Sequence, residues 1–214
     1  MSPRRFGLIT DADARAIAPG STVELEPGGL VTPLARETLQ ARRITVVPAG
    51  GAIDPALPAD LAPVANVARV AIGANADGLA LRDALIAHLR RAGKAVTDVA
   101  GDLTAAGEAP DVAARVATLV TRGEADAGIA IDGAGVVSAI AANKVRGCRA
   151  AMCSSVALAR EARECGGANV LTLGARLLTV AEAVEVVDAW LATSTTDSRH
   201  LRRLLAVRQL EERF

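Results

Sequence analysis

From residue 67 onward, two hydrophobic patterns alternate along the chain. Short continuous apolar runs are typical of buried strands, and longer segments with apolar positions every three or four residues are typical of helices. The predicted strands span residues 67–73, 95–99, 128–131, 149–153 and 170–173. The predicted helices span residues 79–91, 110–122, 136–143, 155–164, 180–192 and 199–213. This alternation predicts an α/β fold, with a Rossmann-like parallel sheet of about five strands and helices on both faces.

The first 66 residues differ from the rest in composition. Eight of the nine prolines lie within the first 63 residues, and the proline-rich stretch 48–66 is typical of a linker. Ahead of it, the pattern predicts helices at 10–15 and 33–41 and strands at 22–25 and 44–47. We therefore expect two domains: residues 1–66, a small N-terminal α/β extension with its linker, and residues 67–214, the Rossmann-like domain.

The composition argues against several classes of protein. Lys and Arg together number 24, as do Asp and Glu, so no excess of positive charge favours nucleic-acid binding. No apolar stretch has the length of a membrane span. With only two histidines and three cysteines without metal-ligand spacing, we expect no metal and no cofactor. The odd cysteine count and the lack of a secretory pattern favour reduced thiols in a cytoplasmic protein.

The segment 128–144 carries the most informative local pattern. A short apolar run leads into the turn Asp132-Gly-Ala-Gly135 and then into small residues typical of a helix. A strand, a glycine turn and a helix in this order direct several backbone N–H groups and the positive helix end at one point. This pattern suits a bound phosphate or oxyanion, and it also occurs in turns that serve only tight packing.

Six segments occur in the order known from one enzyme family. Together they resemble the type B ribose-5-phosphate isomerases and the related galactose-6-phosphate isomerase subunits, over roughly residues 67–210. The most specific parts are the Ile-Ala-Ala-Asn-Lys run and the downstream Arg-His pair. The six segments are Val70-Ala-Ile-Gly73, 128–144, Ala168-Asn-Val-Leu171, Leu173-Gly-Ala-Arg176, Asp188-Ala-Trp-Leu191 and Arg199-His200.

The resemblance implies a homodimer or a dimer of dimers with the active site between subunits. Such enzymes interconvert aldose and ketose phosphates through an enediolate, so the implied ligand is a small phosphorylated sugar. Backbone amides hold the enediolate oxygen in these enzymes. That cradle falls on Gly133, Ala134, Gly135 and Val136 in this chain, although the third glycine of the family pattern is Val137 here.

The resemblance also implies a phosphate clamp near the C-terminus. Arg199 and Arg203 match its two arginines, lie four residues apart and therefore share a helix face. A guanidinium group suits a phosphate, and the alternative is a solvated basic helix. His200 either supports the clamp or packs at the interface. Asn169 matches the family as a binding residue, or it holds a turn.

The catalytic positions of the family are substituted in this chain. Asn75 and Ala76 replace an acid and a histidine after the first strand, and Asn75 is carried forward as a candidate binding residue. The candidate catalytic residues are Asp132, where one branch has a base cysteine, Ser138, where another has a glutamate, and Cys165, at the position of a ring-opening histidine. Losing a positioned acid or base usually costs about 10²- to 10⁴-fold in rate.

Each substituted residue has a structural alternative. Asp132 would be an effective base near neutral pH only if burial raised its pKa from about 3.9, and otherwise it is a helix cap. Cys165 would be reactive only beside a cation, and otherwise it is a buried thiol.

Two main hypotheses of function follow. The leading one is a sugar-phosphate aldose–ketose isomerase-like protein with a substituted active site. The other is a catalytically inactive phosphate-ligand-binding or scaffold protein, or a partner subunit of an active paralogue, because galactose-6-phosphate isomerase builds its site from two different subunits. Residues 29–36 and 43–47 are also similar to a segment that precedes enzymes of bacterial microcompartments. That similarity suggests a docking module for a microcompartment partner, and a plain α/β decoration is the alternative.

Overall fold

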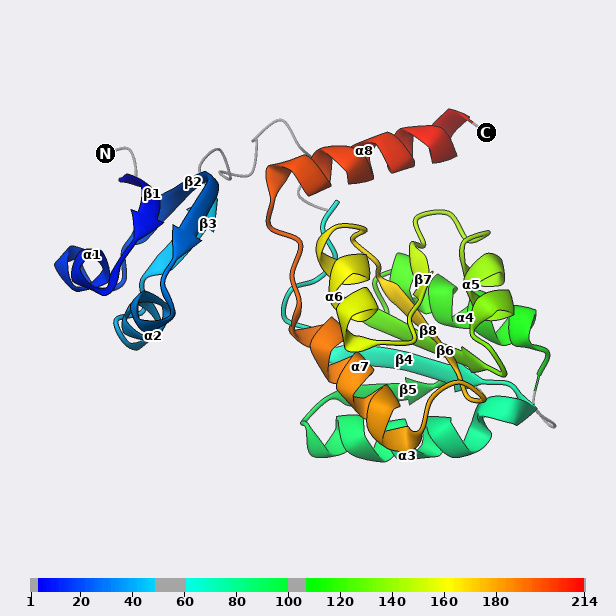
Figure 1. Ribbon diagram of the computed structural model, residues 1–214. Coiled ribbons are helices and arrows are strands. Elements are labelled where there is room, and N and C mark those ends of the chain that lie inside the picture. The colour runs from blue at the N-terminus through cyan, green and yellow to red at the C-terminus, as the bar shows by residue number, and fades with distance from the viewer. Residues whose placement is uncertain (1–3, 49–60, 100–106, 214) are drawn as a thin grey trace. The chain divides into compact units, whose positions relative to one another are not determined.

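The computed structural model describes residues 4–48, 61–99 and 107–213 (Figure 1). The chain forms two compact units, each with its own parallel sheet. The first unit comprises Met1–Pro58 with Thr196–Arg199, and the second comprises Ala59–Thr195 with His200–Phe214. None of the helices in the described ranges is both long and apolar enough to cross a bilayer.

The first unit is a small three-stranded α/β structure. Its strands β1 (Arg5–Ile9), β2 (Thr22–Val31) and β3 (Thr45–Pro48) are parallel and adjacent in that order. Helices α1 (Asp11–Ala16) and α2 (Pro33–Ala41) connect them. This confirms the predicted N-terminal α/β extension, but strand β1 was not among the predicted elements. The hydrophobic core of this unit contains Phe6, Ile9, Ala14, Ile17, Val23, Ala35, Leu39 and Ile44.

The second unit contains the predicted five-stranded parallel sheet. Its strands are β4 (Arg69–Ala74), β5 (Ala95–Asp98), β6 (Ala127–Asp132), β7 (Ala150–Met152) and β8 (Val170–Gly174). They lie in the order β5-β4-β6-β8-β7, and every pairing is parallel. The loops after β4, β6 and β8 therefore meet at one edge, where ligands bind in open α/β sheets.

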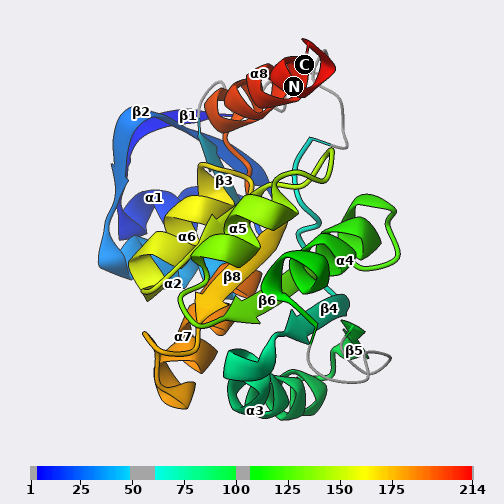
Figure 2. The ribbon, with the colours of Figure 1, turned by 90° about the vertical axis from the view of Figure 1, so that its right-hand side faces the viewer.

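Helices cover both faces of this sheet, as predicted (Figure 2). Helices α4 and α5 pack on one face, and α3 and α7 pack on the other, with α6 beside α7. The helices are α3 (Leu79–Arg91), α4 (Ala109–Thr121), α5 (Val136–Ala142), α6 (Val156–Glu164), α7 (Val180–Ala192) and α8 (Ser198–Arg213). A short 3₁₀ turn, η1 (Ala76–Gly78), follows β4.

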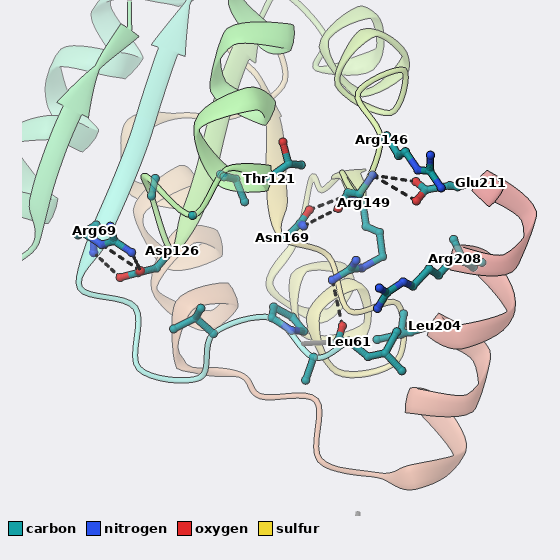
Figure 3. A pocket seen from close by; sticks show the side chains of 18 of the residues that line it. Leu61, Arg69, Thr121, Asp126, Arg146, Arg149, Asn169, Leu204, Arg208 and Glu211 are labelled. Atoms are coloured by element: carbon teal, nitrogen blue, oxygen red, sulfur yellow. Dashed lines mark hydrogen bonds and ion pairs between the residues drawn. The ribbon is translucent and has the colours of Figure 1, made fainter. Parts of the chain in front are cut away.

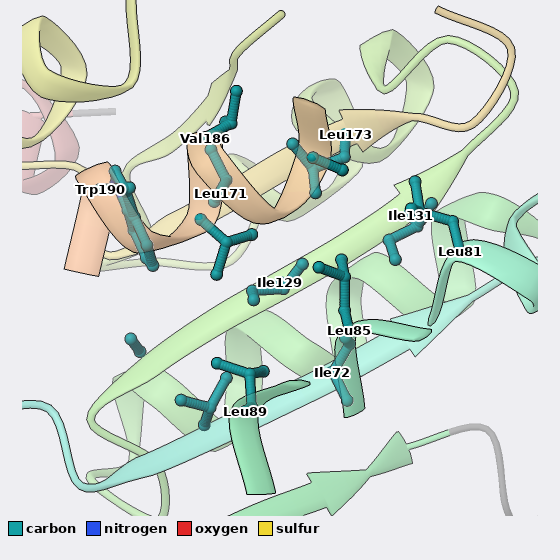
Figure 4. Packing of buried hydrophobic residues seen from close by; sticks show 14 of the residues in the cluster. Ile72, Leu81, Leu85, Leu89, Ile129, Ile131, Leu171, Leu173, Val186 and Trp190 are labelled. Atoms are coloured by element: carbon teal, nitrogen blue, oxygen red, sulfur yellow. The ribbon is translucent and has the colours of Figure 1, made fainter. Parts of the chain in front are cut away.

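The two faces of the sheet are packed differently. Toward α3 and α7 the strands present large side chains, which form the cluster in Figure 4. Toward α4 they present small residues, so the helix lies close to the sheet. A Cβ atom added at Gly73 would lie 2.6 Å from Val112 Cγ1, and one at Gly128 would lie 2.6 Å from Val116 Cγ1. Glycine at these two positions therefore sets the helix–sheet distance.

Candidate functional site

The candidate site begins where β6 ends, at Asp132. The turn that follows leads directly into α5, and Gly135 adopts a left-handed conformation with φ +78°. A Cβ atom at Gly135 would lie 3.0 Å from the carbonyl carbon of Leu173. Both facts require glycine at this position. Val137 lies within α5, and the described non-glycine residues adopt positive φ only at Arg43.

The side chain of Asp132 is folded back into this turn. It is only 5% exposed. Its Oδ1 accepts hydrogen bonds from the amides of Ala134 (2.8 Å) and Gly135 (2.5 Å), and its Oδ2 accepts one from the amide of Ser138 (2.8 Å). The hydroxyl of Ser138 also hydrogen-bonds this carboxylate. Two of the four amides that the resemblance assigns to an anionic ligand, those of Ala134 and Gly135, are thus bonded to the chain's own carboxylate.

These hydrogen bonds determine the ionisation of Asp132. Burial alone would raise its pKa, but the bonds from the hydroxyl and amide of Ser138 and from the amides of Ala134 and Gly135 outweigh burial. The pKa of Asp132 therefore lies below its ordinary value. An ionised carboxylate has about four lone-pair positions, and the four hydrogen bonds use them all.

Two further groups lie at the same edge of the sheet. Asn75 follows β4, and its backbone amide donates to the carbonyl of Ile131 (3.1 Å). Its side-chain oxygen Oδ1 is buried and accepts no hydrogen bond within the described residues. A ligand hydroxyl could hydrogen-bond this oxygen only after the surrounding residues moved, because the oxygen is shielded from solvent.

The second group is an ion pair that the sequence patterns did not reveal. Arg176 Nη2 lies 2.9 Å from Asp77 Oδ2, and the two residues are 99 positions apart. A Cβ atom at Gly133 would lie 3.1 Å from both Arg176 Nε and Asp77 Oδ2. The pair therefore lies directly over the first residue of the β6 loop. Only the Leu173-Gly-Ala-Arg176 match hinted that Arg176 belongs to the site.

Asn169 and Cys165 lie at the other end of the sheet. Asn169 immediately precedes β8 and is 9% exposed. Its Oδ1 accepts the amide hydrogen of Arg149 (2.8 Å), and its Nδ2 donates to the carbonyl of Gly147 (2.9 Å). Both polar atoms of Asn169 thus hold the turn before β7 in place.

Cys165 is the residue after α6 and lies near Arg203. Burial, a hydrogen bond with Glu161 and the charges of Glu161 and Glu164 raise the pKa of the Cys165 thiol to about 11, although Arg203 opposes this. The thiol is therefore protonated at neutral pH. Arg203 itself is exposed on α8.

The other two clamp residues begin the same helix. Arg199 forms an ion pair with Asp197, with 2.6 Å between Nη2 and Oδ2. The Nδ1 atom of His200 is buried and has no hydrogen-bond partner in the described part of the chain. Leu201 and Leu204 of this helix are buried.

The predicted site residues thus form two groups at opposite ends of the strands. Asn75, the residues of the β6 loop and Ser138 lie at the carboxyl end, whereas Asn169 and Cys165 lie at the amino end. Asp132 pairs with Gly174 in the sheet, and β8 begins just after Asn169. Five residues of strand separate the two ends, which is about 16 Å.

A cavity of about 460 Å³ lies at the amino end (Figure 3). Arg149, Asn169 and Arg208 line it, together with the segment 61–64 and the end of α4. Arg149 Nε donates to the carbonyl of Gly167 (2.8 Å). This cavity does not include the β6 loop. Among the described residues, no three His, Cys, Asp or Glu side chains are grouped to hold a metal ion.

The strand order and the helices on both faces define a Rossmann-like α/β domain. Comparison with known proteins identifies its family, because residues 70–207 match the Ribose/Galactose Isomerase family model. The chain is 37% identical over 145 residues to ribose-5-phosphate isomerase B of Escherichia coli, covering 68% of this chain and 97% of that protein. It is also 37% identical over 123 residues to D-erythrulose-4-phosphate isomerase of Pectobacterium atrosepticum, covering 57% and 81%.

Solved structures agree with this match. Ribose-5-phosphate isomerase B of Clostridium thermocellum superposes with a TM-score of 0.65 at 35% identity, covering 68% of this chain and 98% of that one. The Mycoplasma genitalium enzyme, solved with bound ribulose-5-phosphate, gives a TM-score of 0.64 at 34% identity, covering 68% and 97%. The chain therefore belongs to the ribose/galactose isomerase family of sugar-phosphate isomerases.

Proposed function

We propose that this protein recognises a phosphorylated sugar and is an isomerase-like member of its family with a substituted active site. The observation that carries the proposal is the state of Asp132, which stands at the end of β6 with its carboxylate bonded to the loop amides. A ligand oxygen held by the amides of Ala134 and Gly135 would have to displace this carboxylate, and a substrate proton would need a free lone pair on Asp132. Both requirements oppose efficient aldose–ketose turnover.

The family supplies the class of ligand. Relatives are named for ribose 5-phosphate and for D-erythrulose 4-phosphate, which are phosphorylated sugars of different length. The unpartnered Oδ1 of Asn75 supports sugar binding at the carboxyl end, because a sugar hydroxyl would satisfy this acceptor once a local rearrangement exposed it. We propose no metal and no cofactor for this recognition.

We further propose that two copies of the chain build the site together, as a homodimer or a dimer of dimers. Arg203 lies near Cys165 at the amino end of the strands, whereas the β6 loop lies at their carboxyl end, so a second copy would be needed to bring these two parts together. The exposed apolar face of α5 supports this, because Val136 (45%), Val137 (49%) and Ile140 (58%) lie beside the loop. Exposed apolar clusters of this kind mark interaction surfaces.

A second candidate function is an active isomerase in which Asp132 is the base. It is supported by the place of Asp132 at the end of β6, where the resemblance puts a base cysteine. The lowered pKa of Asp132 opposes this role, because it makes the carboxylate a weaker base. If Asp132 is the base, one loop hydrogen bond would have to break before proton transfer. The structural contacts of Ser138 and Cys165 give neither residue a comparable role, because Ser138 is 1% exposed and Cys165 is a protonated thiol.

We also propose a cytoplasmic location, supported by three free cysteines, since thiols stay reduced there. The first unit is proposed as the docking module for a microcompartment or paralogue partner. Co-purification of such a partner with the full chain, and its loss when residues 1–58 are removed, would support this role.

Thermal unfolding against pentose, tetrose and hexose phosphates tests the main proposal. A ligand at 100 times its Kd adds about 2.7 kcal/mol to the free energy of unfolding. We expect stabilisation of the wild type by one sugar phosphate, and none of Arg203→Ala. If no sugar phosphate stabilises the wild type, the proposal is wrong.

Turnover then separates the two candidates. With the stabilising sugar phosphate, an Asp132 base predicts that Asp132→Asn lowers turnover by about 10²-fold or more. The substituted-site proposal predicts turnover near background in both proteins. Rapid turnover by the wild type would overturn it.

A further inference from the structure

An ion pair spans the end of β6 from both neighbouring strands. In the sheet, β6 lies between β4 and β8. Asp77 belongs to the turn after β4, and Arg176 belongs to the turn after β8. Their 2.9 Å contact must therefore cross the loop that follows β6. The two side chains lie over Gly133, because a Cβ there would be 3.1 Å from an atom of each.

The ion pair between Asp77 and Arg176 can be replaced by a contact between Arg176 and a ligand anion at little cost in stability. The side chain of Arg176 is 73% exposed and that of Asp77 is 41% exposed, and exposed ion pairs contribute little to stability. The guanidinium group has a rigid fork of donors that fits a phosphate or carboxylate with two hydrogen bonds. A ligand anion with two free oxygens can therefore replace the single Asp77 contact.

We propose that Asp77 is a specificity-determining residue. Its carboxylate pairs with Arg176 over Gly133 and competes with the anionic group of the ligand for the guanidinium group of Arg176. The inference rests on the proposed function for the identity of the ligand, a phosphorylated sugar. Asp77 thus selects for ligands whose anion binds Arg176 more strongly than a carboxylate does.

Inorganic phosphate is the probe that tests this competition, because it carries the anion without the sugar. Titration at low ionic strength, followed by isothermal calorimetry, gives its affinity for each variant. We expect Asp77→Asn to bind phosphate about twofold to fivefold more tightly than the wild type, the range that an exposed ion pair supports. The double variant Asp77→Asn/Arg176→Gln should lose this gain.

Asp83→Asn is the matched control. The side chain of Asp83 is also exposed and forms an ion pair, with Arg82 at 2.7 Å, and its loss changes the net charge equally. We expect its phosphate affinity to equal that of the wild type. An equal gain in Asp83→Asn, or a gain that persists without Arg176, would show a general charge effect and overturn the proposal. Unchanged or weaker binding by Asp77→Asn would overturn it as well.

The outcome is separable from the proposed function. If Asp77→Asn gains phosphate affinity through Arg176 while no sugar phosphate stabilises the wild type, the competition stands and the proposed function fails. If a sugar phosphate stabilises the wild type and Asp77→Asn binds phosphate no better, the function stands and the competition fails.

Discussion

At the scale of single residues, Asp132 occupies hydrogen-bond donors of the β6 loop. Its carboxylate accepts hydrogen bonds from three amides and one hydroxyl, all within six residues of its own position. Such contacts resemble those of a capping side chain at the start of a helix. Because the Asp132 carboxylate accepts these hydrogen bonds, the loop needs no ligand to satisfy its amides. The amides of Ala134 and Gly135 are then less available to an anionic ligand.

The substitution Asp132→Asn tests how much these bonds contribute. Hydrogen bonds to a charged group contribute about 1.5 to 3 kcal/mol each, and the neutral amide retains part of them. We expect a loss of about 1 to 3 kcal/mol at pH 7, measured by urea unfolding. Because the pKa of Asp132 is lowered by folding, this stabilisation is present above the unfolded-state pKa near 3.9 and is lost as the pH falls through the folded-state pKa.

The difference between the wild type and Asp132→Asn should therefore shrink below about pH 4. Asp77→Asn serves as the control, since its exposed pair should change stability by less than about 1 kcal/mol. A difference that stays constant down to pH 2 would contradict the role of the ionised carboxylate.

Cys165 gives a second prediction at this scale. A thiol whose pKa is raised to about 11 is almost wholly protonated at pH 7.5, so alkylation should be slow. We expect the rate with iodoacetamide, followed by peptide mass spectrometry, to rise about tenfold per pH unit from pH 7 to 10. A rate that levels off below pH 8 would show a reactive thiolate instead.

At the scale of elements, the approach of α4 to the sheet depends on glycine. Gly128→Ala places a methyl group 2.6 Å from Val116 Cγ1, so the helix or the side chain must move. We expect a cost of about 1 to 3 kcal/mol in unfolding free energy. Combining it with Val116→Ala should recover part of the cost of Gly128→Ala, and a purely additive double variant would show that the contact is not the cause.

The sequence predicted elements best where local signals were complete. The predicted helices 79–91 and 180–192 coincide with α3 and α7, and α7 begins with a capping box between Thr179 and Glu182. Strand β1 was missed because its residues, with Gly7 at the centre, give no clear alternation. Its pairing with β2 shifts register between Phe6 and Leu8, so tertiary contacts rather than local pattern define it.

The same distinction applies to the candidate site. The hydrogen bonds of Asp132 reach only residues 134–138, so the sequence alone could suggest a helix-capping role as the alternative to a catalytic base. The Asp77–Arg176 pair depends on β6 lying between β4 and β8, and no local pattern encodes that strand order. The raised pKa of Cys165 likewise depends on burial and on charges brought close by folding.

At the scale of the whole molecule, the β6 loop and Arg203 lie at opposite ends of the strands. The question is whether one binding site combines the loop of one chain with the arginine of another. If a second copy supplies the clamp, a variant damaged in the loop and a variant damaged in the clamp can complement each other. Gly135→Ala damages the loop, because φ there is +78°. Arg203→Ala damages the clamp at the other end of the sheet.

Mixing these two variants after partial unfolding and refolding provides the test. In a shared-site dimer, hybrids form in about half of the molecules, and each hybrid has one site with both defects and one intact site. Sugar-phosphate binding should therefore return to about a quarter of the wild-type capacity, measured by calorimetry with a ligand that stabilises the wild type. If each chain held a complete site, every site in the mixture would still carry one defect, and no capacity would return. Sedimentation at each step checks that dimers have re-formed, so a missing signal can be assigned to the site rather than to assembly.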